Sequence, residues 1–189
     1  MYEEFRTTLG LAPDSKTDIL HHIAALSPAE QEQAHHKIEA VEVKAMTQMQ
    51  PQPGLSDIMA YITKNNLPRA IVTRNKMVPV NHLMSQFMES HHVFDPIITR
   101  DFLPTKPDPA PLLHVIHERW AERIDPEDVM MVGDSIDDMQ AGASAGCVTV
   151  LVAHEKNGYL RDRDIVDYVV KDLGEIVGLL ESGVTSKVR

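Results

Sequence analysis

Three short polar segments contain the residue types that can handle a phosphate group. One carries a hydroxyl, one is basic and one is acidic: Thr73-Arg74-Asn75, Lys106, and Asp134 with Asp137 and Asp138. A hydroxyl, backbone amides and a lysine are groups that bind phosphate oxygens. Carboxylates at a strand end suit Mg²⁺, which takes one or two carboxylates together with water and phosphate. The combination predicts a site that handles phosphate with a metal ion.

Each segment taken singly also has a structural explanation. A threonine at the end of a strand commonly caps a helix, and a lone lysine is usually a solvated surface charge. Asp134 and Asp138 could cap the following helix and complement its dipole, and we expect Asp137 to be a solvated neighbour. The order and spacing of the three segments, rather than any one of them, carry the functional hypothesis.

The segments between these residues predict a parallel sheet covered by helices. Short apolar, β-branched runs predict strands at 70–73, 96–99, 129–132, 148–152 and 168–170. Helical patterns lie between them at 55–65, 79–89, 110–123 and 139–145. Apolar strands that alternate with helices indicate an α/β fold of Rossmann-like type, whose ligands bind beyond the carboxyl ends of the strands. The polar segments follow the first and third of these strands or precede a helix.

The chain changes character near residue 50, which predicts two domains, 1–50 and 51–189. Before that point every apolar run has a helical period. Ser27-Pro28-Ala29-Glu30 is a capping box with proline at the first helical position. We expect the helix that it opens to run to about residue 49, with Ala34, Ile38, Val41 and Ala45 on one face, after a shorter helix at 17–25.

Composition excludes several classes of protein. The 189 residues include 28 acidic and 18 basic side chains, a formal charge of −10, which argues against nucleic acid or an anionic membrane as the main partner. No apolar run is long enough to span a bilayer. The acidic, amphipathic start is unlike a secretory signal, and the single cysteine, Cys147, excludes an internal disulfide framework. We expect a cytoplasmic protein, and the sequence does not fix its oligomeric state.

The polar segments, in this order, resemble motifs of one enzyme superfamily. Their sequences are Ile71-Val72-Thr73-Arg74-Asn75, Lys106-Pro107-Asp108-Pro109, and Val132-Gly133-Asp134-Ser135-Ile136-Asp137-Asp138. They resemble the second, third and fourth motifs of the haloacid dehalogenase superfamily, most closely its phosphoglycolate-phosphatase-like branch with a helical cap. The resemblance covers residues 54–180, and it implies that residues 1–50 are part of such a cap.

The resemblance also implies a role for each matching residue. Thr73 would donate its hydroxyl to the transferring phosphoryl group, beside the backbone amide of Arg74 and with help from Asn75. Lys106 would neutralise the phosphate and the nucleophile. Asp134 would bind Mg²⁺, and Asp138 would bind the ion or hold one of its waters. The implied reaction is Mg²⁺-dependent hydrolysis of a small phosphorylated metabolite through an aspartyl-phosphate.

The first motif of the family, D-x-D-x-[TV] after an apolar strand, is absent. It would supply the nucleophile and a strand in the middle of the sheet, between those ending near Thr73 and Val132. We expect that the chain is an incomplete translation of a longer protein, that another segment closes the gap, or that the sheet is distorted. Asp162-Arg163-Asp164-Ile165-Val166 matches the pattern formally, but it follows the fourth motif and is interpreted as a charged surface turn.

Four other functions remain open. The chain could be a non-catalytic relic that binds phosphate and Mg²⁺, or a subunit whose sheet a partner strand completes. The same scaffold can hydrolyse carbon–halogen bonds, a reaction that would not need the metal cluster of Asp134 and Asp138. A phospho-acceptor signalling domain that uses Asp134 fits less well, because Lys106 precedes the acidic cluster and no second acidic cluster follows an early strand.

Overall fold

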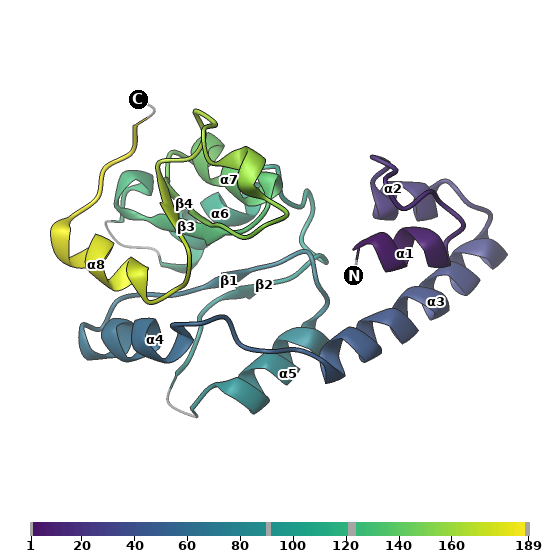
Figure 1. Cartoon of the computed structure of the whole chain (residues 1–189), viewed down its shortest axis with the longest axis horizontal. Coiled ribbons are helices and arrows are strands. Elements are labelled where there is room, and N and C mark those ends of the chain that lie inside the picture. Colours follow the sequence, from purple (N-terminus) through teal and green to yellow (C-terminus); the bar gives the residue numbers. More distant parts are fainter. Residues whose placement is uncertain (1, 90–91, 121–123, 188–189) are drawn as a thin grey trace. The chain divides into compact units, whose positions relative to one another are not determined.

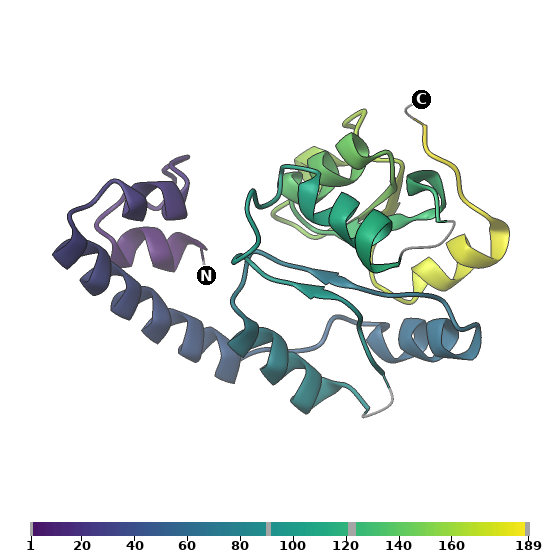
Figure 2. The same cartoon turned by 180° about the vertical axis from the view of Figure 1, so that it is seen from behind.

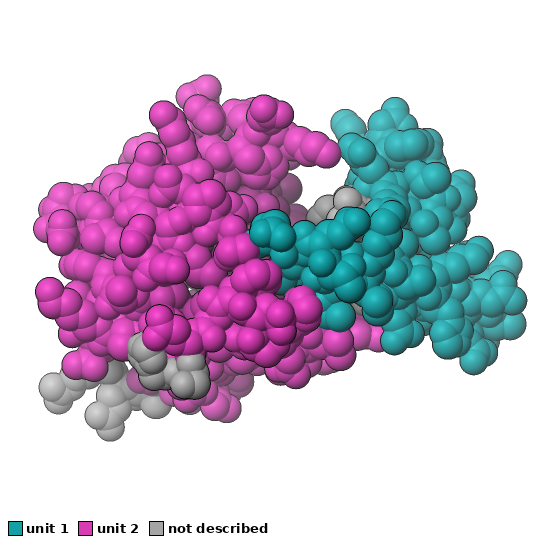
Figure 3. All heavy atoms as spheres, turned by 60° about the horizontal axis from the view of Figure 1, so that its bottom comes forward, with its two compact units in different colours: residues 1–50 teal, residues 51–189 magenta. Residues whose placement is uncertain are grey.

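A computed structural model describes residues 2–89, 92–120 and 124–187. The chain forms two compact units, Met1–Gln50 and Pro51–Arg189, which Figure 3 shows in different colours. In the described residues, no helix is both long enough and apolar enough to cross a membrane.

The first unit is helical. It contains α1 (Tyr2–Thr8), α2 (Ile19–Ala24) and α3 (Pro28–Thr47), and α1 and α2 both pack on α3. The predicted capping box is present, and the Glu30 carboxylate accepts the Ser27 backbone N–H at 3.0 Å. Of the side chains predicted for one face of α3, Ala34, Ile38 and Val41 join a core with Phe5, Ile19 and Ile23, whereas Ala45 is only half-buried. Burying this one face stabilises three helices that would be marginal alone.

The second unit alternates strands and helices along the chain (Figures 1 and 2). Its regular elements are α4 (Leu55–Lys64), β1 (Ile71–Val72), α5 (Met77–Phe87), β2 (Ile97–Ile98), α6 (Ala110–His114), β3 (Met130–Gly133), α7 (Ile136–Ala145), β4 (Val148–Val152), β5 (Tyr168–Val170) and α8 (Glu175–Ser182). Shorter helical turns are a π-helix at Val115–Arg119 and 3₁₀ turns at Pro126–Asp128 and Gly158–Leu160. The predicted α/β class with parallel strands is confirmed.

The boundaries of most elements differ from the predicted ones by one or two residues, and the difference is larger at two helices. The helix predicted for 110–123 is α6 followed by the π-helix, and residues 121–123 lie outside the described residues. α7 begins at Ile136, three residues before its predicted start, because Ser135 caps it: the Ser135 hydroxyl accepts the Asp138 N–H at 3.2 Å. The predicted strands at 148–152 and 168–170 are confirmed residue for residue.

The strands form two parallel sheets rather than one. In the described residues, β1 pairs with β2, and β3, β4 and β5 form a separate sheet in that order. The N–H groups of Ile71 and Thr73 bond to β2 and its flank, so the backbone groups of Val72 face the opposite edge. The division of the sheet lies between β1 and β3, where the sequence analysis expects a strand to be missing.

The three-stranded sheet carries most of the core. β4 is buried along its whole length, and α7 packs on β3 and β4. One side of this sheet packs against α4 and α8 through Ile58, Met59, Val150 and Ile176. Cys147 lies in the cluster formed with α6 and α7, and its burial raises the pKa of the thiol to about 11. This result fits the expectation that Cys147 is buried rather than reactive.

Candidate functional site

Lys106 joins the two sheets. Its Nζ donates to the backbone carbonyl of Val72 at 2.6 Å and to Oδ1 of Asp138 at 2.6 Å. The side chains of the ion pair are 8% and 10% exposed. The carbonyl belongs to β1 and the carboxylate to α7, so one cation spans the division of the sheet. A buried pair of this kind is stable only when its remaining polar atoms are also satisfied.

The second oxygen of Asp138 is used by the start of α7. Oδ2 accepts the N–H of Asp134 at 3.2 Å, and from Ser135 it accepts the N–H at 3.1 Å and the hydroxyl at 2.7 Å. Both carboxylate oxygens therefore already have protein donors. Oδ2 accepts three donors, whereas Oδ1 accepts from Lys106 alone, so a metal ion or a metal-bound water at Asp138 would share Oδ1 with Lys106.

Gly133 makes this arrangement possible. A Cβ at this position would lie 2.4 Å from Cβ and Oδ2 of Asp138, closer than real contacts allow. The glycine at the end of β3 thus lets the Asp138 side chain fold back over the strand end. Glycine is required here because position 133 packs against Asp138, five residues later. The sequence pattern alone does not reveal this contact.

A second link crosses the division of the sheet at the surface. Arg74, which follows β1, forms an ion pair with Asp137 in the first turn of α7. The two side chains are 24% and 26% exposed. The expectation that Asp137 is a solvated neighbour is therefore wrong, because the partner that covers it lies 63 residues earlier in the chain and cannot be recognised from local sequence.

Asp134 is the exposed carboxylate of the site. It follows β3, its side chain is 60% exposed, and its Oδ2 lies 3.7 Å from Nε2 of His154. Its backbone carbonyl accepts a hydrogen bond from the Asn157 side chain at 2.8 Å. Unlike Asp138, this carboxylate faces solvent, which makes it the better placed of the two to bind a ligand.

Thr73 and Asn75 form the turn after β1. The Thr73 N–H donates to Ile98 at 2.9 Å, and the Thr73 hydroxyl oxygen accepts the N–H of Asn75 at 3.1 Å. The hydroxyl uses a lone pair in that bond, so its hydrogen can be donated to a ligand oxygen. Thr73, Arg74 and Lys106 are therefore held near one strand end, at which Lys106 also contacts Asp138.

Sequence reasoning missed two residues, His154 and Asn157, in the loop that follows β4. The side chain of Asn157 is 4% exposed and bonds to the backbone of Asp134, Val152 and His154. The rule that ligands bind beyond strand ends could have found this loop, because it follows a strand directly. The formal nucleophile match at 162–166, by contrast, is an exposed turn at 162–164, as interpreted from the sequence, but its last residue, Val166, is buried.

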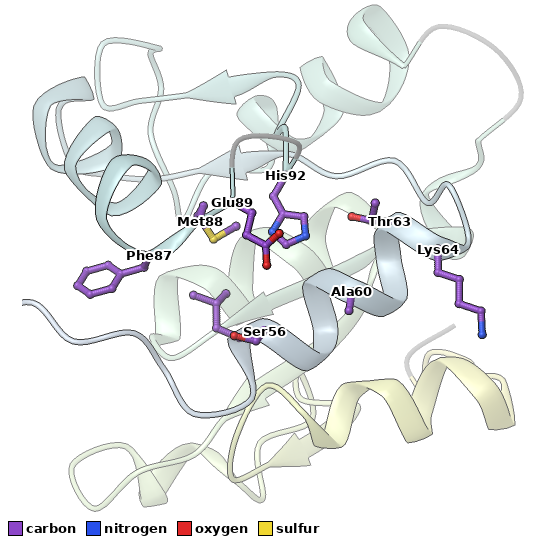
Figure 4. A pocket seen from close by; sticks show the side chains of 9 residues that line it. Ser56, Ala60, Thr63, Lys64, Phe87, Met88, Glu89 and His92 are labelled. Atoms are coloured by element: carbon purple, nitrogen blue, oxygen red, sulfur yellow. The ribbon is translucent and has the colours of Figure 1, made fainter.

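A pocket of about 390 Å³ lies elsewhere in the second unit (Figure 4). It is lined by residues of α4 and by the segment that follows α5, including Thr63, Met88 and His92. Because α5 connects β1 to β2, its end lies near the amino end of β2, opposite to the edge that carries Thr73. None of the predicted site residues lines this pocket.

Comparisons with known proteins point to one family. Residues 3–152 match the family model described as haloacid dehalogenase-like hydrolase. An uncharacterized hydrolase of Saccharomyces cerevisiae is 47% identical over 186 residues, which cover 96% of this chain and 84% of the yeast protein. A phosphoglycolate phosphatase of Psychrobacter arcticus is 40% identical over 97 residues, which cover 51% of this chain and 39% of that enzyme.

Solved structures with a similar fold are also known. The crystal structure of a hydrolase from Pseudomonas syringae superposes with a TM-score of 0.75. The match covers 97% of this chain and 90% of that one, at 16% sequence identity. At this identity the likeness concerns the fold alone.

Proposed function

Because the chain belongs to the haloacid dehalogenase-like hydrolase family, we propose that its second unit is the phosphate- and metal-binding part of a Mg²⁺-dependent hydrolase of small phosphomonoesters. By resemblance, that reaction proceeds through an aspartyl-phosphate on a nucleophilic aspartate. The given sequence has no D-x-D-x-[TV] pattern after an apolar strand. We therefore propose that the 189-residue chain binds a phosphorylated substrate but does not turn it over by itself.

The observation that carries the proposal is the position of Lys106. Its ammonium group lies between the carbonyl that ends β1 and the carboxylate of Asp138, at 2.6 Å from each. A phosphate bound beside the Thr73 hydroxyl would meet this charge at the junction of the two sheets. There, Lys106 would offset the negative charge of the phosphate in a place where little water screens the interaction.

The residues fit Mg²⁺ as an ion held largely by water and phosphate. In the part of the chain that the structure describes, no three His, Cys, Asp or Glu side chains form a group that could hold a metal. Mg²⁺ in enzymes commonly takes one or two carboxylates and keeps several waters, and the exposed Asp134 carboxylate provides one ligand. When bound, the ion would polarise a phosphoryl oxygen. In our proposal Asp134 is the metal ligand, and Asp138 positions the loop and Lys106.

The remaining residues of the site would bind and orient the phosphate. The Thr73 hydroxyl and the backbone amide of Arg74 donate to phosphoryl oxygens in the proposed complex. The N–H of Asn75 fixes the Thr73 hydroxyl oxygen, so the hydroxyl hydrogen is directed away from that amide. The Arg74 side chain is paired with Asp137, which leaves its backbone amide as the phosphate donor.

We propose residues 1–50 as part of a cap and residues 51–189 as the hydrolase core. The family match begins at residue 3 and runs through the first unit into the second, which supports a common origin of both. A cap supplies substrate specificity and excludes water. The expectation of a cytoplasmic location is kept as part of the proposal, and imaging of a tagged chain in cells would test it.

The first experiment measures binding and turnover in one preparation. The purified chain should bind Mg²⁺ with inorganic phosphate, measured by titration calorimetry, and Asp134→Ala should abolish that binding. It should not hydrolyse p-nitrophenyl phosphate. Turnover that disappears in Asp134→Ala would contradict the proposed lack of catalysis. If it also disappeared in Asp162→Ala, the interpretation of 161–164 as a surface turn would be wrong.

A second candidate function is that of a subunit completed by a strand from a partner. The observation that favours it is the division of the sheet, since β1 and β3 each have one paired edge among the described elements. Exposed strand edges can accept an additional strand. A stable complex with an extended peptide of the form apolar strand plus D-x-D-x-[TV], together with gain of phosphatase activity, would favour this function over a relic that only binds.

A further inference from the structure

His154 lies beside Asp134 because the two strands that precede them are neighbours. β3 and β4 pair in parallel, with Gly133 opposite Leu151. The loops that follow them therefore leave the same edge of the sheet. Nε2 of His154 comes within 3.7 Å of Oδ2 of Asp134, and the two side chains are 44% and 60% exposed. Neither the motifs nor the family resemblance described above assigns a role to His154.

The loop fixes which ring nitrogen faces the carboxylate. The backbone N–H of Lys156 donates to Nδ1 of His154 at 3.1 Å. Nδ1 is therefore the acceptor, and the hydrogen of the neutral ring is on Nε2. That N–H is directed to the side on which Asp134 lies. The pairing would be unfavourable in the other tautomer, which would place two lone pairs against each other.

Asn157 holds the loop in this position. Its Oδ1 accepts the backbone N–H of His154 at 2.7 Å. Its Nδ2 donates to the carbonyl of Asp134 at 2.8 Å and to that of Val152 at 2.9 Å. One donor hydrogen thus connects the loop after β4 with the loop after β3, and the other bonds to the last residue of β4. Because Asn157 is buried, the backbones of His154 and Asp134 are held in position relative to each other before any ligand binds.

We propose that His154 is a positioning residue for the Asp134 carboxylate. The inference rests on the proposed function, in which Asp134 binds Mg²⁺. In it, Nε2–H donates to Oδ2 and leaves Oδ1 to face the metal. The present separation of 3.7 Å exceeds a hydrogen bond, and a rotation of the exposed carboxylate on metal binding closes it. Carboxylate and histidine ligands of metals are commonly oriented by such outer partners, whose loss weakens metal binding about 10- to 100-fold.

Three substitutions at position 154 separate this role from a general structural one. Titration calorimetry with Mg²⁺ in excess inorganic phosphate is the measurement. His154→Ala should weaken Mg²⁺ binding about tenfold. His154→Gln should retain binding to within about threefold, because the side-chain amide nitrogen of glutamine reaches the place of Nε2. His154→Asn should behave like the alanine variant, since its amide reaches only the place of Nδ1.

Controls make each outcome decisive. His117→Ala, at an exposed histidine of the π-helix, should leave Mg²⁺ affinity unchanged, and all variants should unfold at the wild-type temperature. Wild-type affinity in His154→Ala, or equal weakening in the glutamine and alanine variants, would overturn the role of His154 while leaving the proposed function intact. Failure of the wild-type chain to bind Mg²⁺, or equal binding by Asp134→Ala, would overturn both.

Discussion

The two sheets of the second unit differ in how firmly their strands are held. β4 lies between two parallel partners, and each of its five residues is buried. β1 has two residues, both partly exposed, and among the described elements it pairs with β2 alone. The acidic residues of the site, Asp134 and Asp138, follow β3 of the three-stranded sheet. Thr73 follows β1 of the two-stranded sheet.

The acidic half of the site and its phosphate-binding half are therefore held in place by different interactions. The acidic half rests on a buried core, while the phosphate-binding half is attached by two polar connections, Lys106 to Val72 and Arg74 to Asp137, and by the packing of the half-buried Val72. The buried pair of Lys106 and Asp138 therefore has a structural role in addition to its chemical one. The predictions below test this comparison through the free energy of unfolding, from the largest expected change to the smallest.

Removing the Asp138 carboxylate should cause the largest loss of stability. Asp138→Ala leaves the buried Lys106 ammonium without its carboxylate partner and removes the acceptor for the amides of Asp134 and Ser135. Breaking such a pair costs about 3–5 kcal/mol, a large part of a typical total of about 5–15 kcal/mol. Urea unfolding measures it.

Two variants control this result. Asp138→Asn keeps an oxygen that can accept from the start of α7 and should lose less stability than Asp138→Ala. Asp162→Ala, in the exposed turn, should change stability by less than about 0.5 kcal/mol. A loss below about 1 kcal/mol in Asp138→Ala would mean that the buried pair does not hold the two sheets together.

Hydrogen exchange compares the two sheets directly. Amides of β4 should exchange only on global unfolding, whereas those of Ile71 and Thr73 should exchange through local opening of β1 and β2. We expect a protection difference on the order of 100-fold, or about 2.7 kcal/mol. Equal protection in both sheets, measured by NMR on the native chain, would contradict the comparison and indicate one cooperative unit.

Cys147 reports on the dry core of the three-stranded sheet through pH. Its pKa is raised from about 9 to about 11 by burial. Between these values the unfolded thiol loses its proton while the folded one keeps it, so the unfolded state binds fewer protons and stability falls as pH rises. The stability advantage of wild type over Cys147→Ala should shrink by about 2 kcal/mol from pH 8 to about pH 11. A pH-independent difference in urea unfolding would mean that water reaches the thiol.

The surface connection of Arg74 and Asp137 should contribute much less. Both side chains are about one quarter exposed, so solvent screens the pair. A double-mutant cycle with Arg74→Ala and Asp137→Ala should give a coupling of about 0.5–1 kcal/mol that decreases with added salt. A coupling above about 3 kcal/mol would mean that the Arg74–Asp137 pair stabilises the protein as much as the buried Lys106–Asp138 pair does.

The sequence predicted the elements better than their association. Strands 148–152 and 168–170 were predictable because both are short continuous runs of apolar and β-branched residues. The two-sheet arrangement is consistent with the lack, in the given sequence, of the strand that the family pattern places between β1 and β3. The pairing of Asp137 with Arg74 and the approach of His154 to Asp134 join residues 63 and 20 positions apart, and no local pattern encodes them.

For the site residues, too, the sequence predicted the residue types but not how each residue is used. The sequence predicted four site residues, because their types, order and motif spacing can be read from it directly: Thr73, Lys106, Asp134 and Asp138. The different use of the two aspartates could not, because it depends on Ser135, Gly133 and Lys106 converging on Asp138. Asp138 and Asp134 are the same residue type, and they differ in burial and in the number of protein hydrogen-bond donors that each carboxylate accepts.

The smallest change in stability is expected on substitution of Asp134, the exposed carboxylate of the site. Asp134→Asn removes a charge that is 60% exposed, so the free energy of unfolding should stay within about 0.5 kcal/mol of wild type. Mg²⁺ binding in inorganic phosphate should nevertheless be lost, because an amide oxygen is a weaker ligand than a carboxylate. Urea unfolding and titration calorimetry on the same protein measure the two effects. If Asp134→Asn cost more than about 2 kcal/mol, the exposed aspartate would be as structural as the buried one, and the contrast between the two carboxylates would no longer explain which of them binds the ligand.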